Sequence, residues 1–148
     1  MYRKMVMKKS LLLCSIVLLT ITPLASSALA KDKIILPTTA VLLDAAGVMA
    51  TYDGKQFAWA HPNTDKVTGT AKFDLKNGLA DGTWKAGKDT GEWESKVTFK
   101  GDQYCFEARG KGQKKYNKMV CNLVYLDGTT TYEIDPKSKR VLSIDTPM

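Results

Sequence analysis

The chain has 148 residues and a formal net charge of +7, from 22 basic and 15 acidic residues. Four of the basic residues and none of the acidic ones lie in the first 30 positions, which leaves 18 basic and 15 acidic residues, a charge of +3, for the rest. A bias this small does not indicate a nucleic-acid binder, and residues 31–148 are enough for one domain but not for two.

Residues 1–30 have the three parts of a secretory signal peptide. A basic start precedes an apolar run over residues 11–22, and Ala28-Leu29-Ala30 forms an A-x-A cleavage site. The run is shorter than the about 20 apolar residues of a membrane-spanning helix. We therefore predict cleavage after Ala30, a periplasmic or secreted location, and no transmembrane segment in the mature chain.

The segment after the signal peptide predicts a helix near residues 38–52. Apolar residues recur at helical spacing from Val41 to Tyr52, Thr38 or Thr39 is placed to cap the start, and Asp53-Gly54 supplies a stop. Because this stripe has no basic polar face, we expect the helix to pack against a sheet and not to lie on a membrane.

From Gln56 onward the apolar residues alternate with polar ones, which predicts short antiparallel strands. Asn77-Gly78 predicts a type I′ hairpin turn, in which both central residues have positive φ. Asp81-Gly82 suggests a bulge or a second turn in the returning strand. Further along, Trp93, Ser95, Val97 and Phe99 share one face of a half-buried strand.

No residue of the chain stands in a recognisable catalytic motif. Glu92 and Glu94 flank Trp93 on the polar face of a strand, where carboxylates usually serve solubility. His61 lies in a polar loop without a nucleophile or an orienting acid nearby. We predict a non-enzymatic protein, with a cell-wall-directed hydrolase that uses Glu92, Glu94 or Glu107 as an alternative.

Cys105 and Cys121 are the cysteines that remain after signal cleavage. An even pair in an exported chain predicts a disulfide. Two thiols and the distant His61 do not supply a zinc site, so we predict no metal and no cofactor. On the strand around Cys105, Tyr104 and Phe106 point to one face and Cys105 to the other.

The segment between the two cysteines is basic. Five cations and one tyrosine make up this candidate binding hairpin: Arg109, Lys111, Lys114, Lys115, Tyr116 and Lys118. Such a loop suits an anionic envelope polymer or an acidic protein, and the alternative is a solvated hairpin tip.

Strands separated by Asn-Gly, Asp-Gly and Pro turns predict a mainly β fold. We expect an antiparallel meander that closes into a small lipocalin-like barrel or half-barrel, with one N-terminal helix, since closure hides the sheet edges. Aromatic side chains at strand spacing would fill its core, and Trp59, Trp84 and Trp93 are candidate cavity-lining residues.

Short aromatic, glycine and cysteine marks along the chain resemble a known family. They are Tyr52-Asp53-Gly54-Lys55, Phe57 with Trp59, Gly69 to Phe73, Gly82-Thr83-Trp84, Gly91-Glu92-Trp93, Tyr104-Cys105-Phe106, Cys121 and Asp127-Gly128. In this order they resemble a family of small exported alphaproteobacterial proteins catalogued as domain of unknown function 995. The resemblance implies an exported domain with paired cysteines and transfers no activity to any residue.

The functional prediction is a binding domain of the cell envelope. We expect an exported barrel that binds a protein or an envelope component through loops on a stable scaffold. The alternative beside the hydrolase is a small-ligand carrier. A hollow interior lined by tryptophans would favour the carrier, and a filled one would favour surface binding.

Overall fold

The structure is a computed structural model that describes residues 34–148; the predicted signal peptide lies outside the described residues. In chain order the elements are β1 (Val41–Leu42), α1 (Ala45–Tyr52), β2 (Gln56–Ala60), β3 (Val67–Asp74), the 3-10 turn η1 (Leu75–Asn77), β4 (Leu79–Ala86), β5 (Asp89–Lys100), β6 (Gln103–Gly110), β7 (Val120–Asp127), β8 (Thr130–Ile134) and β9 (Val141–Pro147).

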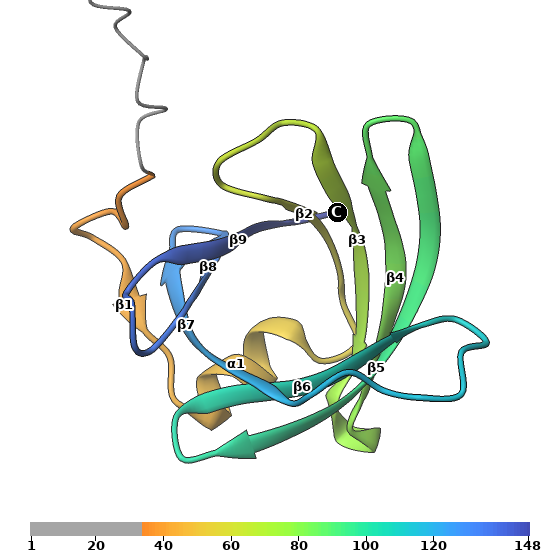
Figure 1. Ribbon diagram of the computed structural model, residues 1–148. Coiled ribbons are helices and arrows are strands. Elements are labelled where there is room, and N and C mark those ends of the chain that lie inside the picture. The colour runs from red at the N-terminus through yellow and green to blue at the C-terminus, as the bar shows by residue number, and fades with distance from the viewer. Residues whose placement is uncertain (1–33) are drawn as a thin grey trace, which may run out of the picture.

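The strands β2 to β9 close into an eight-stranded antiparallel barrel (Figure 1). Each strand pairs with the next one along the chain, and β9 returns to β2, where Asp145 lies opposite Trp59. The short strand β1 joins the ring by pairing with β7, so that Val41 lies opposite Leu126. The predicted antiparallel meander, closed into a small barrel with one N-terminal helix, is therefore confirmed.

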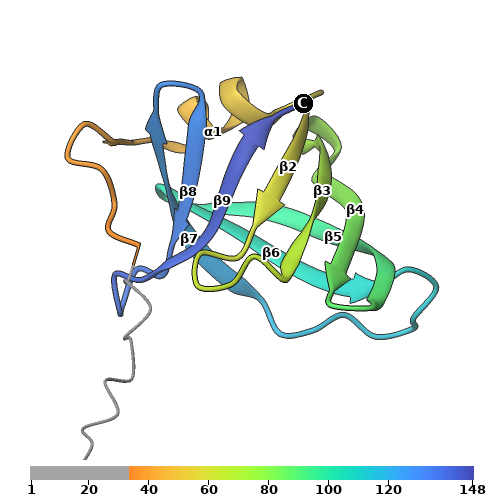
Figure 2. The ribbon, with the colours of Figure 1, turned by 90° about the horizontal axis from the view of Figure 1, so that it is seen from above.

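Helix α1 lies across one end of the barrel (Figure 2). It is shorter than the helix predicted near residues 38–52, because its cap is Asp44 and not Thr38 or Thr39. The Asp44 side chain accepts a hydrogen bond of 2.7 Å from the backbone N–H of Gly47. The preceding Val41-Leu42 is extended as β1 instead of helical.

The hydrophobic core fills the helix end of the barrel. Val48 and Tyr52 of α1 are fully buried there, and the Tyr52 ring lies 4.7 Å from that of Phe57 and 4.5 Å from that of Phe73. Tyr104 completes this group, with its ring 6.3 Å from that of Tyr52. Aromatic rings at these separations attract one another beyond the burial of their surface. The helix is thus fixed to the barrel by its last turn.

Two turns differ from their predictions. Asn77-Gly78 does not form a type I′ turn, because Gly78 has positive φ (66°) and Asn77 does not. Asn77 instead ends η1, and its side-chain amide donates to both oxygens of Asp74, at 3.0 and 2.8 Å. Asp81-Gly82 brings neither a bulge nor a turn, since β4 pairs without a break with β3 and β5.

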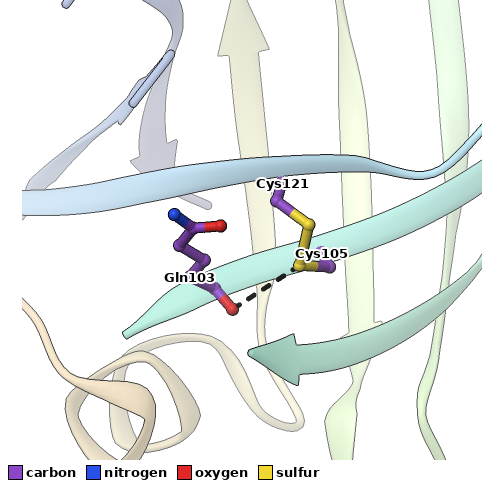
Figure 3. Close-up of a disulfide and its surroundings, with 3 residues drawn as sticks. All are labelled: Gln103, Cys105 and Cys121. Atoms are coloured by element: carbon purple, nitrogen blue, oxygen red, sulfur yellow. Dashed lines mark hydrogen bonds between the residues drawn. A yellow bond between two sulfur atoms is a disulfide. The ribbon is translucent and has the colours of Figure 1, made fainter. Parts of the chain in front are cut away.

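The predicted disulfide is confirmed. Cys105 of β6 lies directly opposite Cys121 of β7, and the two sulfur atoms are bonded (Figure 3). Sγ of Cys105 lies 3.9 Å from the carbonyl oxygen of Gln103; this is a contact, because a disulfide sulfur carries no proton to donate. The strands β6 and β7 pair over only three positions, from Tyr104 to Phe106. The crosslink therefore holds the barrel closed where the ladder between them is short.

Candidate functional site: a cavity inside the barrel

The barrel contains a cavity of about 350 Å³ beyond the packed core. Most of its wall is aromatic or apolar, and five of the lining residues carry a hydroxyl or carboxyl group. The lining residues are Trp59, Ala71, Phe73, Trp84, Trp93, Ser95, Tyr104, Phe106, Ala108, Glu133, Ser143 and Asp145. Phe73 and Tyr104 also belong to the hydrophobic core, so they form the floor between core and cavity. Ligand sites of proteins commonly have this size and this mixture of apolar wall and few polar groups.

The three tryptophans lie flat against the barrel wall because a glycine faces each of them on a neighbouring strand. Trp59 lies opposite Gly69, and Trp84 lies opposite Gly91. A Cβ atom on Gly91 would come within 2.6 Å of the Trp84 ring, so only glycine leaves room for it. Trp93 covers Gly82 in the same way. The wall of the cavity therefore consists of ring faces.

Hydrogen bonds fix two of these rings. The indole N–H of Trp59 donates to the carbonyl oxygen of Thr70, and that of Trp93 donates to the carbonyl oxygen of Thr83, both at 3.2 Å. With their N–H groups engaged by the backbone, these rings offer their π faces to the cavity. All three tryptophans remain half-buried, so part of each ring is accessible.

Two carboxyl groups line the cavity from adjacent strands. Glu133 of β8 accepts a hydrogen bond of 2.7 Å from the side-chain amide of Asn122 at one oxygen. No described residue donates to its other oxygen, Oε1. Part of the Glu133 side chain stays accessible because it borders the cavity, although protein surrounds it otherwise.

Asp145 of β9 is saturated by hydroxyl groups. Oδ2 accepts from the hydroxyl of Tyr52 at 2.8 Å, and Oδ1 accepts from the hydroxyl of Ser143 at 2.6 Å. The hydroxyl of Thr131 lies 2.7 Å from that of Tyr52 and 3.5 Å from Oδ2. Hydrogen bonds of this kind stabilise a carboxylate that has no cation beside it.

Burial changes the acidity of this group. It raises the pKa of Glu133 to about 8, helped by the negative charge of Asp145 and opposed by the hydrogen bond from Asn122. Burial also raises the pKa of Asp145, against the hydrogen bonds from Ser143, Tyr52 and Thr131. The pKa values of the Tyr52 and Tyr104 hydroxyls lie well above their usual range, first because of burial and then because of the two acids. Glu133 is therefore mostly protonated at neutral pH.

Two buried polar atoms near these acids have no hydrogen-bond partner among the described residues. They are Oγ of Ser95, which lines the cavity, and Oδ1 of Asn122, whose amide nitrogen is bound to Glu133. Each residue is 2% exposed. A buried oxygen without a partner costs about 1–3 kcal/mol. At the cavity wall, the Ser95 hydroxyl is therefore a group that an incoming polar ligand atom would stabilise.

The predicted site residues fall into separate parts of the molecule. Trp59, Trp84 and Trp93 line the cavity together, as the strand spacing suggested. Glu92 pairs with Lys111 at 3.3 Å, and Glu94 pairs with Arg109 at 2.6 Å, both away from the cavity. Glu107 lies opposite Lys96 on the outer face of β5 and β6. His61 is exposed after β2, where its Nδ1 accepts from the backbone N–H of Asn63.

The basic segment between the cysteines is a regular hairpin only near the disulfide. Residues 111–119 form a loop, and its Tyr116 ring packs under two cations, 4.8 Å from Nζ of Lys96 and 4.2 Å from the guanidinium carbon of Arg109. Since Arg109 and Lys111 also form ion pairs, much of the predicted basic surface is neutralised. The exposed residues that keep its positive charge are Lys114, Lys115 and Lys118.

The polar side of the cavity is not predicted by the sequence: it consists of Glu133, Ser143 and Asp145, and the acids among them are hydrogen-bonded by Tyr52, Asn122 and Thr131. On β8, Thr131 and Ile134 are buried and Glu133 lines the cavity, with a register shift between Glu133 and Ile134 that breaks the simple alternation. Carboxylates within short strands normally point to solvent. The spacing of Ser143 and Asp145 was the one available signal, since it places both on the same face of the last strand.

Comparisons with known proteins found no matching family model, no matching curated protein and no matching solved structure. The resemblance to domain of unknown function 995 therefore stays a prediction. Between residues 34 and 148 no helix is long and apolar enough to span a membrane. Within the same range no three His, Cys, Asp or Glu side chains gather into a metal-ligand cluster.

Proposed function

We propose that this protein is an exported, non-enzymatic carrier that binds a small organic ligand inside its barrel. The observation that carries the proposal is the cavity of about 350 Å³, whose wall combines three tryptophans on β2, β4 and β5 with the polar side chains of Glu133, Ser143 and Asp145 on β8 and β9. A filled barrel would gain stability by closing this space with larger side chains, yet alanine stands at positions 71 and 108 of the wall.

Export is part of the proposal. The signal-like sequence of residues 1–30 and the disulfide between Cys105 and Cys121 both suit an oxidising compartment. Membership in the uncharacterised exported family named above is a further proposal.

Binding through the basic loop is the weaker candidate. Two of its five cations are held by Glu92 and Glu94, and its tyrosine is covered by Lys96 and Arg109. The same ion pairs occupy two of the carboxylates of the alternative hydrolase. The cavity, by contrast, presents groups that the fold itself leaves without partners.

A neutral fluorescent probe tests the proposal. N-phenyl-1-naphthylamine brightens in apolar sites, so titration into the oxidised, exported protein should give saturable binding of one probe per chain. Ala108→Trp fills the cavity and should weaken binding at least tenfold. Thr98→Trp places the same side chain on the exposed outer face of β5 and should leave binding unchanged.

Native circular dichroism of each variant establishes that the barrel is intact. Absence of saturable binding to the wild-type protein would overturn the proposal. So would equal binding to the wild type and to Ala108→Trp, because the probe would then sit elsewhere on the surface.

A further inference from the structure

We propose that the ligand is an organic cation, an amine on a flat apolar body, whose nitrogen is held by the carboxylate of Glu133 at the cavity wall. This inference rests on the proposed function, since it names the chemical class of the ligand of the same cavity.

Glu133 presents an open carboxyl oxygen to the cavity. Its Oε1 receives no hydrogen bond from the described chain, and the Ser95 hydroxyl, which can donate or accept, is the other polar group of the wall without a partner. An ammonium group carries three donors and no acceptor, and a carboxylate or carbonyl ligand carries acceptors alone. Once Glu133 has given up its proton, its open oxygen is complementary to an ammonium group and repels an anionic ligand.

The titratable groups at the cavity also favour an organic cation as the ligand. The titratable groups that face Glu133 are Asp145 from β9, Tyr52 from α1 and Tyr104 from β6. No lysine, arginine or histidine of the described chain lines the cavity. No protein cation therefore stabilises the ionised form of Glu133, and a bound ammonium group would do so as the carboxyl gives up its proton.

The aromatic wall suits the rest of such a ligand. The faces of Trp59, Trp84 and Trp93 carry the negative side of the ring quadrupole, which attracts cations as well as flat apolar groups. Sites that recognise ammonium ligands commonly combine such faces with a carboxylate. A bicyclic body of about a dozen non-hydrogen atoms matches a site of this volume.

Three probes of one shape test the charge. Isothermal titration at pH 7.5 compares 2-naphthylmethylamine, 2-naphthylmethanol and 2-naphthoate, which differ in charge on the same ring system. We expect the amine to bind at least tenfold more tightly than the alcohol, and the naphthoate to bind most weakly. Glu133→Gln should weaken the amine about tenfold to a hundredfold and leave the alcohol nearly unchanged.

Glu107→Gln is the matched control, because it removes a carboxylate from the outer face of the barrel, on β6.

A second measurement separates a charge effect from a change in the shape of the cavity. Because Glu133 is mostly protonated in the free protein, binding of the amine should release a proton, visible as a dependence of the binding heat on the ionisation enthalpy of the buffer. Glu133→Gln should abolish that dependence.

The outcomes distinguish the two proposals. If the alcohol binds as tightly as the amine and Ala108→Trp still blocks both, the cavity is a ligand site and the cationic class is wrong. If the amine is preferred and Glu133→Gln does not weaken it, the role of Glu133 is wrong. If N-phenyl-1-naphthylamine and all three naphthyl probes fail to bind the folded protein, both proposals fall.

Discussion

The hydroxyl of Tyr52 donates a hydrogen bond of 2.8 Å to Oδ2 of Asp145, and so connects the only helix of the described chain to its last strand. Tyr52 is fully buried, and its ring also packs on Phe57 and Phe73. The helix that covers the barrel end and the carboxylate that borders the cavity therefore belong to one hydrogen-bonded unit.

Removing this hydroxyl should destabilise the fold. In Tyr52→Phe the ring packing stays, but Asp145 loses one of its donors while buried, so we expect a loss of about 1–3 kcal/mol in the free energy of unfolding. Urea denaturation followed by tryptophan fluorescence measures it. Tyr132→Phe, at a half-buried position with its ring outside the cavity, serves as the control and should change stability by less than about 0.5 kcal/mol.

The stability should fall as the pH rises. The pKa of Glu133 is raised to about 8 in the folded state, above its ordinary value of 4.5, so between these values the folded protein binds the proton that the unfolded chain has lost. Below pH 4.5 Glu133 is protonated in both states and does not change the free energy of unfolding. Between pH 4.5 and pH 8 its titration lowers that free energy by up to a few kcal/mol, and above pH 8 it lowers it no further. The raised pKa of Asp145 acts in the same direction.

Urea unfolding at intervals between pH 5 and pH 9 measures this slope. Glu133→Gln should flatten most of it, whereas Glu107→Gln should keep it. An equal slope in wild type and Glu133→Gln would show that Glu133 is ionised in the folded state at neutral pH.

Loss of the disulfide should weaken the barrel. Cys105 and Cys121 are 16 positions apart, and a crosslink over a loop of this length stabilises a domain by about 3 kcal/mol in the chain-entropy account. Reduction, or the double change Cys105→Ala and Cys121→Ala, should lower the free energy of unfolding by that amount. The reductant should have no effect on the double variant, and an equal effect on both proteins would contradict the assignment.

The glycine beneath Trp59 should tolerate no side chain. In Gly69→Ala the new Cβ would meet the carbonyl oxygen of Thr83 and lie 2.5 Å from the Trp59 ring. Backbone cannot yield as a flexible side chain does, so we expect a loss of about 1–3 kcal/mol and a changed tryptophan emission spectrum. Thr68→Ala, one position earlier on the same strand, should have little effect on either measurement.

Removing the positive charges of the loop lysines should barely change the free energy of unfolding. Lys114, Lys115 and Lys118 are exposed, so their joint change to Ser should shift the unfolding free energy by no more than about 0.5 kcal/mol. Arg109→Ala removes an ion pair with Glu94 and a contact with Tyr116, and should cost about 1 kcal/mol. Thermal melting of the two variants side by side shows whether Arg109→Ala is the less stable one.

The sequence predicts the barrel better than it predicts the cavity chemistry, for a physical reason. Alternation along β5 places Trp93 and Val97 inside, because apolar side chains in a half-buried strand have one favourable face. The same alternation rule would place the charged side chain of Glu133 on the outer face of β8. Its position at the cavity depends on hydrogen-bond partners from other strands, such as Asn122 of β7, which the pattern of a single strand does not reveal. The helix start shows a similar limit: Thr38 and Thr39 look as suitable as Asp44 until the pairing of β1 with β7 is known.

The closed ring has a consequence for how other proteins can recognise this one. Every strand from β2 to β9 has a neighbour on either side, but the ladder between β6 and β7 stops at Phe106, and beyond it the loop reaches the β6 backbone through Asn117. Recognition by strand addition, in which an extended peptide extends a sheet, therefore has only short templates among residues 34–148: this end of β6 and the two residues of β1. A protein partner that binds elsewhere on the barrel would have to read the side chains on the outside of the wall.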